Sequence, residues 1–495
     1  MKTLLLSILC AAGLLAQSAL AQSALAQSAP AQSAPAQSAP AQSAPAQSAP
    51  PPQTPLSLDD IMNNVEKNYP PLLVTLAERA LADADVLQAL GRFDLVLSAQ
   101  ADTDQFGYYR NERLTAGFDQ PLSTMGASVY GGWRGSEGSF APYAGAQDTR
   151  SFGEWRGGIK VPLTKNRQID DRRGNLQKTR IGQRIASLTI DQQRLVIRQL
   201  AARRYWDWVA AGQRLRVANE ILRVAQERDA ALREASSLGQ IPAIEVTENQ
   251  RQILQRRSQL VEAERAIQQA AIELSLFYRD GAGQPLMAGN AQLPAKLPPT
   301  QTLDDTQVET DRVAALNLRP EIERFSQQKK QAEIDTSLAE NDRKPAVDFS
   351  LGFTAEGGDG TVRRGPNEMK ASLRFELPFQ RRAAAGKLLS AETKVTQLTQ
   401  RERFARDQVE AEVQDAASAV RAAHIRAALL RDEVQVSLDL ADAERERFRL
   451  GDSNLFTVNL REQAAVDAEL RQVSAVSDYL RFLTVYDQVT ARLLH

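Results

Sequence analysis

The chain repeats one pattern of residues at the same distances. In the first copy, Gly174 lies 65 residues before Gly239, which ends the sequence R-E-x-x-x-L-G. In the second copy, Gly386 stands in the same relation to Gly451, and corresponding positions are offset by 212 residues. The protein is therefore an internal duplication, and the uninterrupted helical pattern between the two glycines predicts one very long helix per copy. Such a unit cannot close a compact core alone, so neighbouring units must cover it.

The long helical segments carry the seam of a coiled coil. In the second copy, apolar residues step alternately by four and three positions, and alanines in the seam allow close approach of neighbouring helices. We expect helices packed side by side in a tube or bundle. The seam residues are Val409, Val413, Ala416, Val420, Ala423, Ala427, Leu430 and Val434 in the second copy and Ile181, Ile185, Leu188, Leu195, Ala202, Trp206 and Val209 in the first.

Strand patterns precede both long helices, at 93–163 and 347–379. In the second segment, apolar residues alternate strictly with polar ones, although the neighbouring alanine-rich helices offer little apolar surface to cover them. We therefore expect the apolar strand face to meet lipid, with Asp348, Arg374 and Glu376 facing a wet lumen. The first segment has 71 residues against 33 in the second, which predicts either an added hairpin or a long extracellular loop.

The N-terminus has the layout of a secretory signal peptide, with an apolar run and a small-residue cleavage site that ends at Ala21. Cys10, the only cysteine, lies inside this segment and lacks the small preceding residue of a lipid-anchored one. Seven pentads of AQSAL or AQSAP follow from residue 16 to 50, a composition typical of an extended linker.

The chain is accordingly divided into a signal peptide (1–21), a linker (22–56), a first repeat (57–280), a connector (281–303) and a second repeat (304–495). The first repeat is expected to hold a helix at 58–91 capped by Ser57, the strands, a long helix at 174–238 and a helix at 243–280. The second is expected to hold a helix interrupted at Arg319 and Pro320, its strands, a long helix at 386–450 and a helix at 454–494.

Composition argues against several classes of function. Lysine and arginine number 60 against 61 aspartates and glutamates, so the chain lacks the positive excess that binds nucleic acid. Of the two histidines, His424 has no metal-ligand spacing around it, and a structural role is favoured. No catalytic motif is present, so we predict no enzyme activity, no cofactor and no metal.

Charged residues near the two Leu-Gly sequences are the remaining candidates for a site. They are either solvated helix ends or, when symmetry brings copies together, rings that line a constriction. They are Glu245, Glu248, Asp452, Arg461 and Glu462. Aromatic residues in the first strand segment are either loop packing or a girdle at the membrane interface. These are Tyr108, Tyr109, Tyr130, Trp133, Tyr143 and Trp155.

Taken together, residues 57–494 resemble the TolC-type outer-membrane efflux protein family. The duplicated unit carries the resemblance, together with the segment Leu316–Ile322 (LNLRPEI), the Val-Pro-Leu and Leu-Pro-Phe strand ends and the final helix with Asp478, Tyr479 and Leu483. The fold class it implies is mixed and mainly α: a trimeric outer-membrane β-barrel continued by a long periplasmic α-helical coiled-coil barrel. The protein would be a passive exit duct of a tripartite efflux pump or type I secretion system in a Gram-negative outer membrane. A soluble periplasmic coiled-coil adaptor or scaffold is the alternative.

The resemblance also implies partners and a gate. The protein would be a homotrimer whose tips, Leu238 with Gly239 and Leu450 with Gly451, dock a periplasmic adaptor that joins it to an inner-membrane pump. The family's gate places acidic residues six and nine positions after each tip glycine. The first copy has Glu245 and Glu248 there, whereas the second has Thr457 and Leu460, followed by Arg461.

Overall fold

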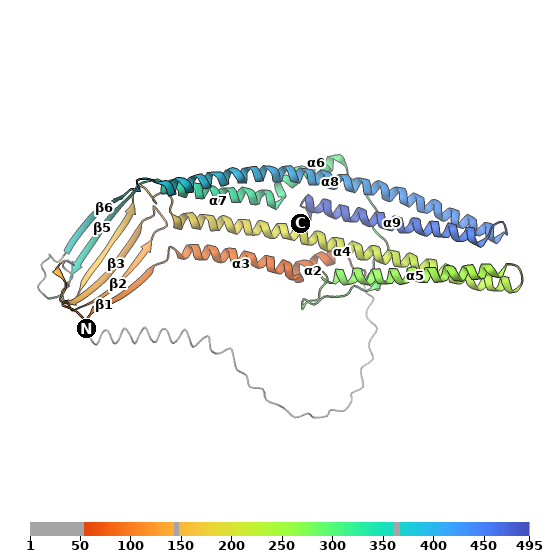
Figure 1. The fold of residues 1–495 in the computed structure, drawn as a ribbon, viewed down its shortest axis with the longest axis horizontal. Helices are drawn as coiled ribbons and strands as arrows, with labels where there is room; N and C mark the ends of the chain where they lie inside the picture. The colour runs from red at the N-terminus through yellow and green to blue at the C-terminus, as the bar shows by residue number, and fades with distance from the viewer. Residues whose placement is uncertain (1–53, 143–147, 360–366, 495) are drawn as a thin grey trace, which may run out of the picture. The chain divides into compact units, whose positions relative to one another are not determined.

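A computed structural model describes residues 54–142, 148–359 and 367–494 (Figure 1). The predicted signal peptide, nearly all of the predicted linker, and Tyr143 lie outside the described residues. The described part of the chain consists of helices that run lengthwise beside one another and a single sheet that continues from one end of them.

Two helices, not one, precede the first strands. Ser57 caps α2 (Leu58–Asn68) through a capping box, in which its Oγ accepts from the Asp60 amide at 3.1 Å. The chain then breaks at Tyr69 before α3 (Pro70–Gly91), so the single helix predicted from 58 to 91 is wrong. Pro70 forces the residue before it into an extended conformation, and its ring nitrogen has no hydrogen to donate.

The sheet is antiparallel and has six strands in sequence order. The first strand segment contributes four of them and the second two, so the additional length is a hairpin; the register places β4 directly beside β5 and joins the two repeats. The strands are β1 (Val96–Asp104), β2 (Asn111–Pro121), β3 (Ser128–Gly138), β4 (Glu154–Pro162), β5 (Ala346–Glu356) and β6 (Asn367–Glu376).

The register gives the sheet two different faces. Residues paired across strands share a face, and Ile159 pairs with Leu351, which pairs with Ala371. Three positions away on β5, Asp348 pairs with Arg374 on the opposite face. The apolar and polar sets separate cleanly, and Asp348, Arg374 and Glu376 fall together on the polar face.

The aromatic residues do not form one girdle. Trp133 pairs with Trp155 on the apolar face, near the end of the sheet distant from the long helices. Tyr130 has the opposite parity and lies on the polar face, where its hydroxyl would be 2.7 Å from a Cβ at Gly158 and 2.9 Å from one at Gly352. Tyr130 therefore packs over two glycines on the polar face, which favours packing over the girdle among the two alternatives for this residue.

Two long helices span the length of the helical layer, α4 (Asp171–Ser237, 67 residues) and α8 (Arg382–Arg449, 68 residues). Pairs of shorter helices lie alongside them: α3 and then α5 (Ala243–Ser275) along α4, and α7 (Pro320–Asp342) and then α9 (Leu455–Val489) along α8. Helix α6 (Asp305–Leu318) packs on α8. None of the described helices is apolar over a length sufficient to cross a membrane.

Two of these helices are shorter than the sequence predicted. Helix α5 ends at Ser275 rather than 280, because the chain turns there into a short bridge between Arg279 and Pro285. Helix α9 ends at Val489 rather than 494, where Ala491 adopts a left-handed conformation (φ 60°) before a final 3-10 turn. Where a helix ends in this way depends on the residues that its end packs against. The hydrophobic periodicity of the sequence does not predict those contacts.

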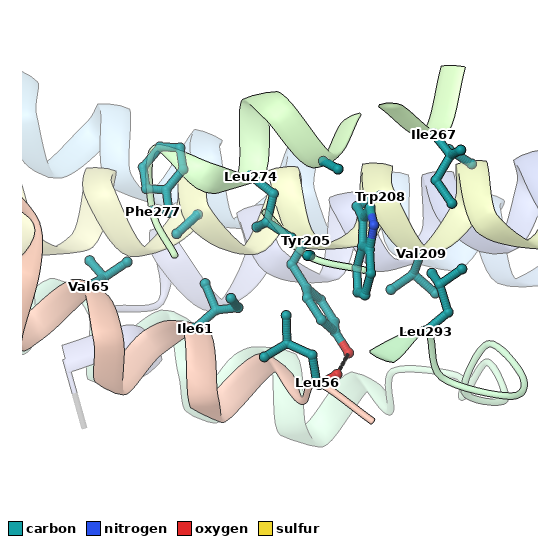
Figure 2. Packing of buried hydrophobic residues seen from close by; sticks show 14 of the residues in the cluster. Leu56, Ile61, Val65, Tyr205, Trp208, Val209, Ile267, Leu274, Phe277 and Leu293 are labelled. Atoms are coloured by element: carbon teal, nitrogen blue, oxygen red, sulfur yellow. Dashed lines mark hydrogen bonds between the residues drawn. The ribbon is translucent and has the colours of Figure 1, made fainter. Parts of the chain in front are cut away.

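Each repeat has its own hydrophobic core. The first surrounds Trp208 and Tyr205 on α4, with Ile61 from α2 and Leu274 from α5, and the Tyr205 hydroxyl donates to the Leu56 carbonyl at 2.9 Å (Figure 2). The second core is built from the α8 seam, from Val409 through Ala423, and from Tyr479, Leu480 and Tyr486 of α9. Seven of the eight predicted α8 seam residues are buried, and Leu430 is half-buried.

Candidate functional site at the helix tips

The two helical hairpins end in the same turn. After α4, the amides of Leu238, Gly239 and Gln240 donate to carbonyls of the last helical turn, at 3.1, 3.0 and 2.9 Å. After α8, Leu450, Gly451 and Asp452 make the equivalent bonds at 3.0, 3.0 and 2.9 Å. Both glycines adopt positive φ, 74° and 84°. The repeated L-G sequence thus specifies one backbone structure twice, a left-handed helix stop.

Each turn presents an apolar side chain to solvent. Leu238 is 66% exposed and Leu450 62% exposed, although both are large aliphatic residues. The glycine beside each has open space around it, because a Cβ there would meet nothing within 4 Å. The conservation of glycine between the two copies is therefore a matter of backbone conformation and not of crowding.

Substitution of the tip glycines tests whether their role is conformational. Gly239→Ala or Gly451→Ala is expected to destabilise the local tip turn by about 1 kcal/mol, since a Cβ disfavours positive φ. Gly386→Ala is the matched control: it lies inside α8 with open space around it, and alanine there should stabilise the helix by about 0.5–1 kcal/mol. Amide hydrogen exchange of the tip residues measures the difference. Equal exchange in all three variants would contradict the conformational explanation.

The five gate candidates occupy different environments. Glu245, in the first turn of α5, is half-buried, and its Oε2 is buried without a hydrogen-bond partner among the described residues. Glu248 accepts two bonds from Arg251, at 2.7 and 2.9 Å, which hold the pKa of its carboxyl below the usual range. Thr457 is engaged in helix capping, where both its amide and its hydroxyl donate to Asn454.

Leu460 and Arg461 are exposed on α9, one helical turn beyond Thr457. No hydrogen bond or ion pair links either of them to Glu245 or Glu248 within the described residues. A single chain therefore does not assemble the five candidates into one site. A gate built from them needs further copies of the chain.

A buried ionic cluster near the tips was not predicted. Glu462 of α9 was expected as a tip charge, but its side chain is only 3% exposed and accepts from three arginines on three other helices. Arg445 of α8 donates at 2.9 Å and Arg256 of α5 at 3.1 Å, while Arg228 of α4 pairs with the same carboxylate. One carboxylate thus connects all four helices of the tip region.

The cluster holds three positively charged side chains and one negatively charged side chain. Burial by itself would raise the pKa of Glu462, but Arg228, Arg445 and Arg256 outweigh it and hold that pKa below its ordinary value. Arg256 is 1% exposed, and burial lowers its pKa. Its Nη1 also donates to the Ile221 carbonyl at 3.1 Å. Three guanidinium groups therefore share one carboxylate, and only Arg445 among them has a second carboxylate partner in the described residues, Asp442.

The sequence contains a signal for this cluster. On α9, Leu455, Val458, Glu462 and Ala465 follow the three-four step of a seam, and all are buried. On α4, Arg228 stands between the buried Ala225 and Leu232 at the same spacing. A charge at a seam position indicates a buried partner, because an isolated charge there would cost too much desolvation energy.

Elsewhere, polar contacts also join the two repeats. Helix α4 meets α9 through Arg481 to Asp207 at 2.7 Å and Arg214 to Ser474 at 3.0 Å. The two hydrophobic cores share Trp206 of α4 and Leu297, which pack against both. In the tip region, the Glu462 cluster adds a buried ionic connection between the two repeats.

Metal chemistry has no visible basis in the described ranges. No group of three or more histidine, cysteine, aspartate or glutamate side chains gathers there in a metal-binding arrangement. His424 Nδ1 lies 3.0 Å from the Thr300 hydroxyl, and its ring approaches Tyr479. The histidine thus packs the connector against α8.

Comparison with known proteins identifies solved structures of similar fold. No family model matches the chain, and no curated protein matches it in sequence. Solved structures do match: the open state of the Neisseria gonorrhoeae MtrE outer membrane channel has a TM-score of 0.62 at 14% identity, covering 88% of each chain. The outer membrane protein VceC of Vibrio cholerae matches with 0.61 and 16%, over 88% of this chain and 95% of that one.

The Campylobacter jejuni CmeC outer membrane channel matches similarly, with a TM-score of 0.59 at 13% identity over 88% of this chain and 85% of that one. The described chain therefore has the protomer fold of these outer-membrane channels. The fold class expected from the resemblance to TolC-type proteins is confirmed.

Proposed function

We propose that the protein is an outer-membrane channel, the exit duct of a tripartite efflux pump or type I secretion system. It forms a homotrimer in the outer membrane of a Gram-negative bacterium, with its helices in the periplasm. It catalyses no reaction: an inner-membrane pump, joined to it by a periplasmic adaptor, supplies the energy. Cargo passes through the lumen to the exterior.

The observation that carries this proposal is the uncovered apolar face of the sheet. Leu97 of β1 is 76% exposed and Phe375 of β6 is 65% exposed, and the apolar positions between them continue across the sheet. All six strands have nine to eleven residues, the length a tilted strand needs to span a bilayer. In water, such a surface would aggregate, whereas lipid covers it without cost.

Extraction tests the membrane assignment. The protein is expected to stay in the membrane fraction after high salt and carbonate and to leave it only in detergent. Release by carbonate alone would favour the soluble adaptor or scaffold instead. Reconstitution in planar bilayers then tests conduction, because a scaffold gives no single-channel steps.

The tips are proposed as the docking point of the adaptor. Leu238 and Leu450 project from turns of the same backbone structure, so a trimer would present six such turns in a ring, Leu238 with Gly239 and Leu450 with Gly451 in each copy. Exposed apolar side chains at the end of a helical hairpin suit a partner that binds end to end. Loss of adaptor cross-linking in a Leu238→Ser, Leu450→Ser variant that still folds would support this assignment.

We propose a gate formed by Glu245 and Glu248 in the first repeat. The second repeat would contribute the residues at the corresponding sequence positions, Thr457 and Leu460, together with Arg461. Glu245→Lys is expected to lower the cation selectivity of the closed channel, because it replaces a negative charge by a positive one at the constriction that several copies would form together. Glu248→Lys should act more weakly, since Arg251 already neutralises that carboxylate.

Reversal potentials in a salt gradient measure the change in selectivity. Glu446→Lys is the control, since this residue lies before the tip on the surface of α8 and pairs with Arg449. Equal selectivity in all three variants and the parent would mean that Glu245 and Glu248 are solvated helix ends.

A further inference from the structure

We propose that the end of the sheet nearest the helices binds the phosphate groups of anionic phospholipids in the periplasmic leaflet of the membrane. The binding groups are arginines at the junctions between helices and strands, Arg92, Arg167, Arg343 and Arg381. This inference rests on the proposed function, because it requires the sheet to lie in a membrane.

Each of the four helix–strand junctions carries one of these arginines. The junctions are α3–β1, β4–α4, α7–β5 and β6–α8, and they hold, in that order, Arg92, Arg167, Arg343 and Arg381. All four side chains are exposed, and none of them has a hydrogen bond or an ion pair with another described residue. Their charges are therefore free to bind a ligand from outside the chain.

The balance of charge at this end of the sheet is positive. The four connecting segments (92–95, 163–170, 343–345 and 377–381), with the two helical residues that adjoin each, hold eight cations and four carboxylates. The cations are Arg92, Lys165, Arg167, Arg172, Arg343, Lys344, Arg381 and Arg382, and the carboxylates are Asp94, Asp170, Asp171 and Asp342. Asp342 already pairs with Lys165, and Asp170 with Arg173. Asp348 and Glu376 lie nearby, but on the polar face of the sheet.

The junction arginines begin where the apolar face of the sheet ends. Leu95, Leu163 and Leu377 are exposed and continue the alternation of that face beyond β1, β4 and β6. Phe379 is 96% exposed and lies two residues before Arg381. A phospholipid whose acyl chains cover the apolar face therefore brings its phosphate to the level of the arginines.

The junctions lie side by side, so the arginines form a row. Asp342, at the end of α7, pairs with Lys165 after β4 at 3.0 Å and with Lys387 of α8 at 2.9 Å. Helix α3 contacts α4, α4 contacts α7, and α7 contacts α8, and their ends lie beside the sheet (Figure 1). Because neighbouring helices are about 8–10 Å apart, the row extends across about 24–30 Å of each copy.

An anionic phospholipid fits this row better than a soluble anion, because two features act on it together. Guanidinium groups bind phosphate oxygens through parallel N–H bonds, and the exposed apolar side chains beside them contact the acyl chains. A free anion gains only the first interaction. A zwitterionic lipid brings an ammonium group that the arginines repel.

Lipid retention by the detergent-solubilised protein tests the proposal. After incubation with equal amounts of phosphatidylglycerol and phosphatidylcholine, native mass spectrometry identifies the bound lipid by its mass. The parent is expected to retain phosphatidylglycerol in preference. In the variant Arg167→Gln, Arg343→Gln, this preference should fall by about fivefold for each arginine removed. The variant Arg167→Lys, Arg343→Lys should keep most of it, because lysine also binds phosphate as a point charge.

Arg401→Gln, Arg403→Gln is the matched control. It removes the same charge from two exposed arginines of α8 that lie about 30 Å along the helix from its start. The preference for phosphatidylglycerol should not change in this variant. High salt should weaken the preference of the parent, because the arginines are exposed to solvent.

A parent-like preference in Arg167→Gln, Arg343→Gln, with conduction intact, would overturn this inference and leave the channel function standing. Arg92 and Arg381 lie at opposite edges of the chain, so they are tested as a separate pair. If Arg92→Gln, Arg381→Gln separates into single chains and keeps the lipid preference, these two arginines pair with a neighbouring copy, and their assignment to lipid is wrong. Release of the protein by carbonate would overturn both the proposed function and this inference.

Discussion

Glu462→Gln is expected to lower the free energy of unfolding of the tip region by about 3–5 kcal/mol, the usual cost of leaving buried charges without their partner. The substitution preserves the shape of the side chain and removes the one carboxylate that Arg228, Arg256 and Arg445 share. Hydrogen exchange of the ends of α4, α5, α8 and α9 measures the loss.

Glu446→Gln is the matched control for this experiment. It removes a carboxylate on the same helical hairpin, but one that forms an exposed pair with Arg449, and pairs of that kind contribute little. No measurable change is expected. Equal protection of the tips in the two variants would show that the buried cluster does not hold the four helices together.

The same cluster predicts a dependence on pH. The folded pKa of Glu462 lies below its ordinary value of 4.5, so the carboxylate contributes stability that is present above about pH 4.5 and is lost as the pH falls further through the folded pKa. The tips of the parent should therefore lose protection in acid below that pH. In Glu462→Gln, this part of the acid dependence should be absent.

Phe353→Arg is expected to prevent stable membrane assembly, because it places a guanidinium on the apolar face of β5. A cation on the lipid face of a membrane strand costs about 2–4 kcal/mol near the midplane. Phe353 pairs with Gly157 and Met369 on that face. The expected result is loss of the folded, heat-modifiable species from outer-membrane fractions and a lower urea midpoint in vesicles.

Thr354→Arg is the control, one residue further along the same strand. Thr354 pairs with Arg156 and Glu368 on the polar face, where another charged side chain meets water. Assembly should be normal, with altered conductance at most. If the two variants assemble equally well, the apolar face does not contact lipid, and the proposed membrane position of the sheet is wrong.

Much of the architecture was readable from local pattern. The duplicated Leu-Gly turns, the lengths of α4 and α8, the buried α8 seam and the two-faced strands all follow from spacing within a few residues. The break at Tyr69 was equally local, since Pro70 and Pro71 mark it, but the helical periodicity on both sides concealed it. The charged residues at seam positions, Arg228 and Glu462, were also a local signal, and they indicated buried ionic partners.

Other features required the tertiary structure, because they depend on contacts between residues far apart in the chain. Sequence length showed that the first strand segment was enlarged, but only pairing between strands showed a hairpin, and only the register placed Tyr130 on the polar face. Glu462 finds Arg256 and Arg228 at sequence separations of 206 and 234 residues, which no periodicity predicts.

By itself, the sequence determined the duplication, the two long helices, the tip turns and the alternation of the strands, since each rests on backbone hydrogen bonding and side-chain period within one element. The tertiary structure alone decided the number of strands, the partners of the buried charges and the open edges of the sheet. Those depend on which elements become neighbours, and that is settled by burial and charge pairing across the whole fold.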